Sequence, residues 1–186
     1  AYNAIDTATA EALDAIGERL AGRDDIRVVV VGNDADLAAV LKALLRADRL
    51  DVEVAFTPAE ATTATRRYGL PHGPAARELA EHGTADTLPL IRDDAATVVV
   101  GRARHLGAEG AKLHGETYVD NERLFDGEVK SVLIEPTVDE PGVRAQVERL
   151  LLPGRPVAGH PRLRAGGLQL GLLLPLPRVR VREVGA

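Results

Sequence analysis

The first half of the chain alternates between helical and strand-like spacing of its apolar residues. Leucine and isoleucine recur every three or four positions over residues 13–20, which predicts an amphipathic helix that ends at Gly22. The unbroken valines at residues 28–31 predict a strand that is covered on both faces. Helical spacing returns over residues 37–45, and strict alternation over residues 52–56 predicts a second strand.

Two further helices complete this half of the chain. The run from Thr57 to Glu60 predicts a helix start, with Thr57 as the N-cap and Glu60 completing a capping box. That helix is expected to end near Gly69, and the next is expected over residues 74–82. Because helices and strands alternate, residues 1–86 are predicted to form a Rossmann-like α/β domain with a small parallel sheet.

The second half is predicted to consist mainly of strands. The pair Asp126-Gly127 predicts a hairpin turn between two of them. The spacing of apolar residues from Val143 to Leu151 predicts one helix. Residues 87–186 are therefore expected to form a mainly antiparallel β domain. Its strands are expected at residues 88–92, 97–100, 117–119, 123–125, 129–135, 167–174 and 179–182.

Composition narrows the classes of function. The formal net charge is −5 and only 3% of the residues are aromatic, so no nucleic-acid partner is expected. The absence of cysteine excludes disulfides, thiolate nucleophiles and cysteine-ligated metals. The longest apolar stretch, Leu168 to Leu176, is interrupted and too short to span a bilayer, and the N-terminal residues lack a signal-peptide pattern. A cytoplasmic protein without a transmembrane segment is therefore expected.

The end of the first predicted strand carries the main candidate site. The strand stops at Gly32 and continues through Asn33, Asp34 and Asp36 into a helix. At such turns α/β folds hold nucleotide phosphates and their metal ions. Aspartate at a helix start is also a common cap, so the two acids have a structural interpretation beside the functional one.

Together these features resemble the diacylglycerol kinase catalytic domain family, which shares a superfamily with the NAD kinases. Members of this family carry a Gly-Gly-Asp-Gly-Thr turn after a buried strand. In this chain Gly32 and Asp34 match the turn, whereas Asn33, Ala35 and Asp36 replace its second glycine, its third glycine and its threonine.

A second stretch also carries the resemblance. The family has a Pro-x-Gly-Thr-x-Asn loop after the next strand. Pro58 matches the start of this loop, whereas Glu60, Ala61 and Thr63 stand where glycine, threonine and asparagine are found in the family.

The resemblance, which spans residues 27–135 in order and pattern, implies an ATP-dependent lipid kinase that uses Mg²⁺ and holds its ligand in a cleft between two domains. Because glycines let phosphate approach the backbone closely, their replacement predicts weak or absent activity. The residues that the resemblance assigns to nucleotide binding are Gly32, Asn33, Asp34, Thr62 and Thr63, and those that it assigns to the metal are Asp34 and Asp36.

Other interpretations of the candidate residues stay open. Thr62 and Thr63 can bond to the backbone of their own helix start instead of a nucleotide. Glu116 and Asp120 share a face of a predicted strand, where they can serve as a base or metal ligand or simply face solvent. The alternatives to a kinase are a protein that binds a nucleotide or another small molecule without catalysis, and a regulatory domain that associates as a homodimer.

Overall fold

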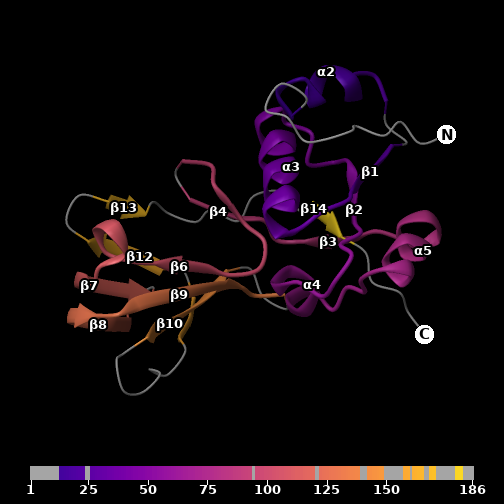
Figure 1. The fold of residues 1–186 in the computed structure, drawn as a ribbon. Coiled ribbons are helices and arrows are strands. Elements are labelled where there is room, and N and C mark those ends of the chain that lie inside the picture. The colour runs from indigo at the N-terminus through magenta and orange to yellow at the C-terminus, as the bar shows by residue number, and fades with distance from the viewer. Residues whose placement is uncertain are drawn as a thin grey trace. The chain divides into compact units, whose positions relative to one another are not determined.

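The structure is a computed structural model, and it divides into two compact units. It describes residues 13–23, 26–93, 95–119, 122–138 and 142–148, and the backbone of the strands at 157–159, 161–165, 168–170 and 179–181. The first unit contains residues 1–90 and 177–186, and the second contains residues 91–176 (Figure 1). The sequence placed a single boundary at residue 86, without the return of residues 177–186 to the first unit. The mixture of helices and strands makes this an α/β protein, as expected.

The first unit holds the described α-helices and a parallel pair of strands, whereas one turn of 3-10 helix, Ala108–Gly110, lies in the second unit. Strands β1 and β2 pair in parallel, with Val28 opposite Val54 and Val30 opposite Phe56. A second, antiparallel pair joins β14 to β3, with Val181 opposite Asp86. The elements of this unit are α2 (Ile16–Leu20), β1 (Arg27–Val30), α3 (Asp34–Arg46), β2 (Glu53–Phe56), α4 (Thr63–Tyr68), α5 (Pro74–His82), β3 (Asp86–Leu88) and β14 (Val179–Val181).

Helix α3 supplies much of the core of the first unit. Its apolar residues Leu37, Leu41 and Leu44 are buried at the spacing that predicted this helix, and Leu44 has no exposed surface. On β2, Val54 and Phe56 are buried while Glu53 and Ala55 are half-buried, as the alternation predicted. Helix α5 also has the bounds expected from the sequence.

The helix start predicted at Thr57 is wrong. The backbone nitrogen of Thr57 donates to the carbonyl of Val30 at 2.8 Å, and this bond continues the contact between β1 and β2 beyond the end of β2. Helix α4 instead begins at Thr63 and has Thr62 as its N-cap. It ends, as expected, at Gly69, which has a left-handed φ of 66°.

The second unit is built from antiparallel strands, as expected. One four-stranded sheet has the order β11-β10-β9-β6, and the other has the order β13-β12-β7-β8. A short hairpin of β4 and β5 adds to them. The strands are β4 (Ile91–Arg92), β5 (Val98–Val99), β6 (Ala103–His105), β7 (Leu113–Val119), β8 (Glu122–Val129), β9 (Ser131–Pro136), β10 (Val143–Glu148), β11 (Val157–Gly159), β12 (Pro161–Ala165) and β13 (Leu168–Leu170).

Two sequence predictions for this unit are wrong. A helix was predicted from Val143 onwards, but residues 143–148 form strand β10. Its buried residues Val143, Ala145 and Val147 alternate with more exposed ones. Residues 143 and 147 share a face in both a helix and a strand, so their spacing did not separate the two. The pair Asp126-Gly127 lies inside β8, opposite β7, and does not form a turn.

The two four-stranded sheets supply one apolar cluster. Val132 and Ile134 of β9 and Phe125 of β8 belong to it, together with the buried residues of β10. On the opposite face of β9, Glu135 pairs with Arg102 at 2.8 Å. This alternation of apolar and charged faces is typical of antiparallel sheets with one solvated side.

A further ion pair crosses from β10 to β6. Glu148 pairs with Arg104 at 3.1 Å, and it also accepts a hydrogen bond from the hydroxyl of Ser131, which is fully buried. The bond from Ser131 holds the pKa of Glu148 below its usual value, and the nearby Arg104 adds to this effect.

We expect Glu148 to make the protein sensitive to acid. A carboxyl group whose pKa is lower in the folded state stabilises the fold above its unfolded pKa, and this contribution is lost as the pH falls through the folded pKa. Below pH 4.5 the stability of the wild type should therefore fall more steeply than that of Glu148→Gln. Urea denaturation at neutral and acid pH measures this slope. Equal slopes for the two proteins would contradict the prediction, and Glu60→Gln, at an exposed position, is the control that should follow the wild type.

Candidate functional site

The carboxyl ends of β1 and β2 bring the two candidate loops together. In a parallel pair these ends lie at the same edge of the sheet, so the loop before α3 and the loop before α4 are neighbours. The contact between them is direct: Oδ2 of Asp34 accepts a hydrogen bond from the backbone nitrogen of Ala64 at 3.1 Å. Asp34 is the first residue of α3 and Ala64 follows Thr63 in α4, so candidates from both loops meet here.

Asn33, and not an aspartate, is the N-cap of α3. Its Oδ1 accepts from the backbone nitrogens of Ala35 at 2.8 Å and Asp36 at 3.3 Å. Asp36 completes a capping box, because its Oδ2 accepts from the backbone nitrogen of Asn33 at 2.8 Å. The polar groups of Asn33 and Asp36 thus serve the helix start, as the structural interpretation of an acid at this turn expected.

Gly32 is required by this capping box. Its φ of 155° is rare for residues with side chains, and a Cβ there would lie 2.2 Å from Oδ2 of Asp36. Glycine therefore lets the carboxylate of Asp36 fold back over the turn.

The loop before α4 also ends in a capping box, formed by Thr62 and Thr65. Thr62 accepts a hydrogen bond from the backbone nitrogen of Thr65 at 3.1 Å, and the hydroxyl of Thr65 accepts from the backbone nitrogen of Thr62 at 2.8 Å. The hydroxyl of Thr62 is therefore engaged in its own helix start, which is the local interpretation of this residue. Thr63 is half-buried as the first residue of α4.

One side-chain oxygen of Asp34 accepts no hydrogen bond from the described residues. Its Oδ1 is buried and has no hydrogen-bond partner among the described residues. A buried carboxylate oxygen without a partner is costly, and a water molecule or a cation beside it would remove that cost.

Sequence reasoning did not identify Tyr68, which follows Ala64 by one helical turn and is half-buried. Burial raises the pKa of Tyr68, the positive charge of Arg67 opposes this shift, and the negative charge of Asp34 adds to it. The spacing of four residues in α4 was the available signal for Tyr68, since it places residues 64 and 68 on one face.

The side chains at this turn can supply only part of the ligands of a Mg²⁺ ion, and water or phosphate oxygens would have to supply the rest. No group of three histidine, aspartate or glutamate side chains that could hold a metal occurs in the described part of the chain. Mg²⁺ in phosphate sites keeps several waters and is held by one or two carboxylates together with the phosphates. Oδ1 of Asp34 can supply one such ligand, whereas Oδ2 of Asp36 is engaged in the capping box.

The candidate residues of the second unit are not part of this turn. Glu116 accepts a hydrogen bond from the hydroxyl of Tyr118 at 3.0 Å, and this bond raises the pKa of Tyr118. Asp126 lies opposite Glu116 in the strand register. Asp120 lies outside the described residues.

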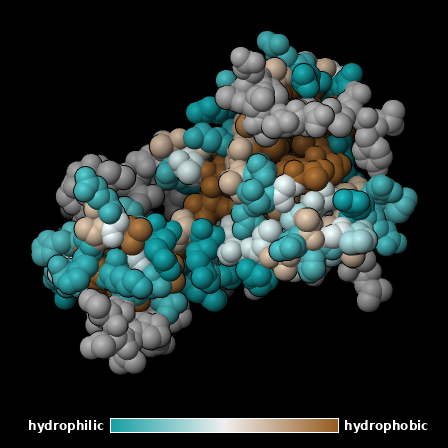
Figure 2. Space-filling view, in the orientation of Figure 1, coloured by the Kyte–Doolittle hydropathy of each residue, from teal (hydrophilic) through white to brown (hydrophobic). Residues whose placement is uncertain are grey.

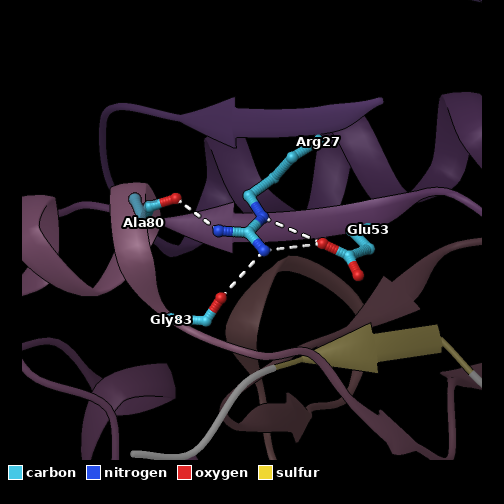
Figure 3. Close-up of polar contacts among 4 residues, drawn as sticks. All are labelled: Arg27, Glu53, Ala80 and Gly83. Carbon is cyan, nitrogen blue, oxygen red and sulfur yellow. Dashed lines mark hydrogen bonds and ion pairs between the residues drawn. The ribbon is translucent and has the colours of Figure 1, made fainter. Parts of the chain in front are cut away.

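A second polar cluster in the first unit is centred on Arg27, which sequence reasoning did not identify. Its guanidinium group donates two hydrogen bonds to Glu53, at 3.0 and 2.7 Å, and one each to the carbonyls of Ala80 and Gly83, at 2.6 and 2.9 Å (Figure 3). Arg27 therefore joins the paired strands β1 and β2 to the end of α5. It also borders a small hollow whose other walls are mostly alanine, valine and leucine. Because all three guanidinium nitrogens already donate within the protein, this cluster is structural.

No family model matches the chain, and no curated protein matches it. Among the described residues, no helix is long and apolar enough to cross a membrane.

Proposed function

We propose that this protein is a divergent member of the diacylglycerol kinase-like proteins, with a Rossmann-like first unit that binds a nucleotide where β1 and β2 end. The observation that carries the proposal is the carboxylate of Asp34. It joins the two loops through Ala64, and its buried Oδ1 has no hydrogen-bond partner in the part of the chain that the structure describes. Ligands of parallel α/β sheets bind at this edge of the sheet.

ATP and Mg²⁺ are the proposed ligands. The ion would be held by Oδ1 of Asp34 and by the phosphates, and it would supply positive charge for their oxygens. Asp36 is proposed as a ligand only through its Oδ1, because its Oδ2 accepts a hydrogen bond from the backbone nitrogen of Asn33. Gly32, Asn33, Thr62 and Thr63 would border the phosphates through their backbone.

Phosphoryl transfer is proposed to be slow or absent. Phosphate sites at helix starts depend on backbone N–H groups that are free to donate. Here the caps formed by Asn33 and Thr62 occupy several of these groups, and Asp34 occupies the nitrogen of Ala64. Two aspartates at the turn also repel phosphate unless a cation lies between them.

A thermal-shift panel of nucleotides, with and without Mg²⁺, tests the proposal. A ligand that binds the folded state raises the unfolding temperature. We expect ATP with Mg²⁺ to raise it, and we expect Asp34→Asn to weaken ATP binding at least about tenfold, because the substitution removes the charge that attracts the ion. Asparagine keeps an oxygen that can accept from Ala64, so the variant should still fold.

The matched control is Asp48→Asn. Asp48 is exposed near the other end of α3 and has a positive φ of 54°, which asparagine tolerates. This variant should respond to ATP as the wild type does. An absence of response to every nucleotide, or an unchanged response in Asp34→Asn, would overturn the proposal. Transfer to a lipid acceptor at about 1–100 per second, the range of active kinases, would overturn its statement that transfer is slow or absent.

A further inference from the structure

A nucleotide at the turn between β1 and α3 would need positive charge from the protein as well as from Mg²⁺. Asp34 and Asp36 bring two carboxylates to this turn, and the caps formed by Asn33 and Thr62 occupy N–H groups that could otherwise donate to phosphate. One divalent ion balances only part of the charge of a triphosphate. A cationic side chain beside the two loops would complete the site.

Arg66 of α4 extends its guanidinium group back to the loop that precedes this helix. Side chains of a helix lean toward its N-terminal end, and Nη1 of Arg66 donates to the carbonyl of Ala61 at 3.4 Å. Because this bond is long and Arg66 is exposed, the guanidinium group can turn to a ligand at little cost to the fold. The neighbouring Arg67 is half-buried and its Nε is buried, so Arg66 is the arginine of α4 that a ligand can reach.

The segment that Arg66 contacts also lies beside Asp34. The backbone nitrogen of Ala64 donates to Oδ2 of Asp34 at 3.1 Å, and Arg66 contacts Ala61, three positions earlier in the chain. Three residues of extended chain reach only about 10 Å, so the carboxylate and the guanidinium group contact the same end of α4. White and teal residues predominate where this helix lies in Figure 2, so its surface is polar in this view. A metal ion on Asp34 and the guanidinium group of Arg66 can therefore contact one polyphosphate chain.

We propose that Arg66 binds a phosphate group of the nucleotide. This inference rests on the proposed nucleotide site, and it names the group that replaces the occupied N–H donors there. A guanidinium group donates two parallel hydrogen bonds to phosphate, and such charge-assisted bonds are stronger than those between neutral groups. Mg²⁺ on Asp34 and the guanidinium group of Arg66 would contact different phosphate oxygens. The ligand class of the site is then a nucleoside diphosphate or triphosphate.

Isothermal titration calorimetry of the full chain with ATP and Mg²⁺, at several salt concentrations, tests this inference. Arg66→Gln should bind ATP at least about tenfold more weakly than the wild type, because a charge-assisted contact with phosphate is lost. The affinity of this variant should also depend less steeply on salt, since salt screens the contact that it lacks. A purely structural role of Arg66 would not change the salt dependence.

Two further variants complete the experiment. Arg66→Lys keeps the charge but not the two parallel donors, so its affinity for ATP should lie between those of Arg66→Gln and the wild type. Arg46→Gln is the matched control and should bind ATP as the wild type does, because Arg46 is exposed in the last turn of α3, at the end away from Asp34.

The outcomes separate this inference from the proposed function. Equal ATP affinity in Arg66→Gln and the wild type, or a weaker affinity with unchanged salt dependence, would overturn the role of Arg66 and leave the nucleotide site standing. An absence of nucleotide binding by the wild type would overturn both.

Discussion

Replacing Arg27 with methionine is expected to lower the free energy of unfolding by about 3 kcal/mol. The guanidinium group donates to Glu53 on the neighbouring strand and to the carbonyls of Ala80 and Gly83, and its side chain is 25% exposed. Methionine fills similar space but cannot donate. The substitution therefore leaves a half-buried carboxylate and two carbonyls without their partner, and this loss is the source of the effect.

Urea denaturation of the variant and the wild type measures this difference. Arg77→Met is the matched control, because Arg77 lies exposed on α5, and its loss should stay within about 0.5 kcal/mol. The double variant Arg27→Met with Glu53→Leu should be more stable than Arg27→Met alone, since no carboxylate is left unpaired. A loss below about 1 kcal/mol for Arg27→Met would show that the cluster does not hold α5 on the sheet.

Gly32→Ala is expected to cost about 3 kcal/mol of stability and to weaken nucleotide binding. A Cβ at this position would lie 2.2 Å from Oδ2 of Asp36 and 2.8 Å from its Cγ. The carboxylate of Asp36 would have to leave the backbone nitrogen of Asn33, and the capping box of α3 would be lost. The φ of 155° adds strain for alanine at the same place.

Gly22→Ala separates backbone strain from the clash. Gly22 also has a left-handed φ, of 66°, but a Cβ there would meet nothing within 4 Å. This control should cost about 1 kcal/mol, from strain alone. Chemical denaturation compares the two variants. Equal losses would mean that the capping box at Gly32 contributes nothing to stability.

The elements that were predicted correctly are determined by residues close to them in the chain. Helix α5 runs from Pro74 to His82 as expected, because proline starts it and glycine follows it. The predicted start at Thr57 failed for a tertiary reason: its backbone nitrogen bonds to Val30, which is 27 residues away in the chain. A capping pattern does not reveal such a partner.

In the second unit, too, a local sequence pattern did not reveal a partner that is distant in the chain. Asp126-Gly127 is a strong hairpin signal, yet Gly127 lies within β8 opposite Gly115 of β7. Its φ of 102° is compatible with glycine inside the strand as well as in a turn. The turn signal therefore reports the backbone freedom of glycine, and strand pairing decides how that freedom is used.

The sequence supplied the candidate residues of the site, but it did not predict the contacts among them. The resemblance indicated Asp34 and Thr62 as candidates in separate loops. It did not predict that Asp34 bonds to Ala64 across 30 residues, or that Asn33 would be the cap. Both depend on the parallel pairing of β1 with β2, which brings the loops together.

An NMR titration of the protein with ATP and Mg²⁺ tests the proposed nucleotide site most directly. We expect the largest amide shifts at the turn from Gly32 to Asp34 and at the start of α4 around Ala64, and we expect Asp34→Asn to lose the part of these shifts that depends on Mg²⁺. The absence of shifts at saturating nucleotide, or shifts confined to the second unit, would contradict it.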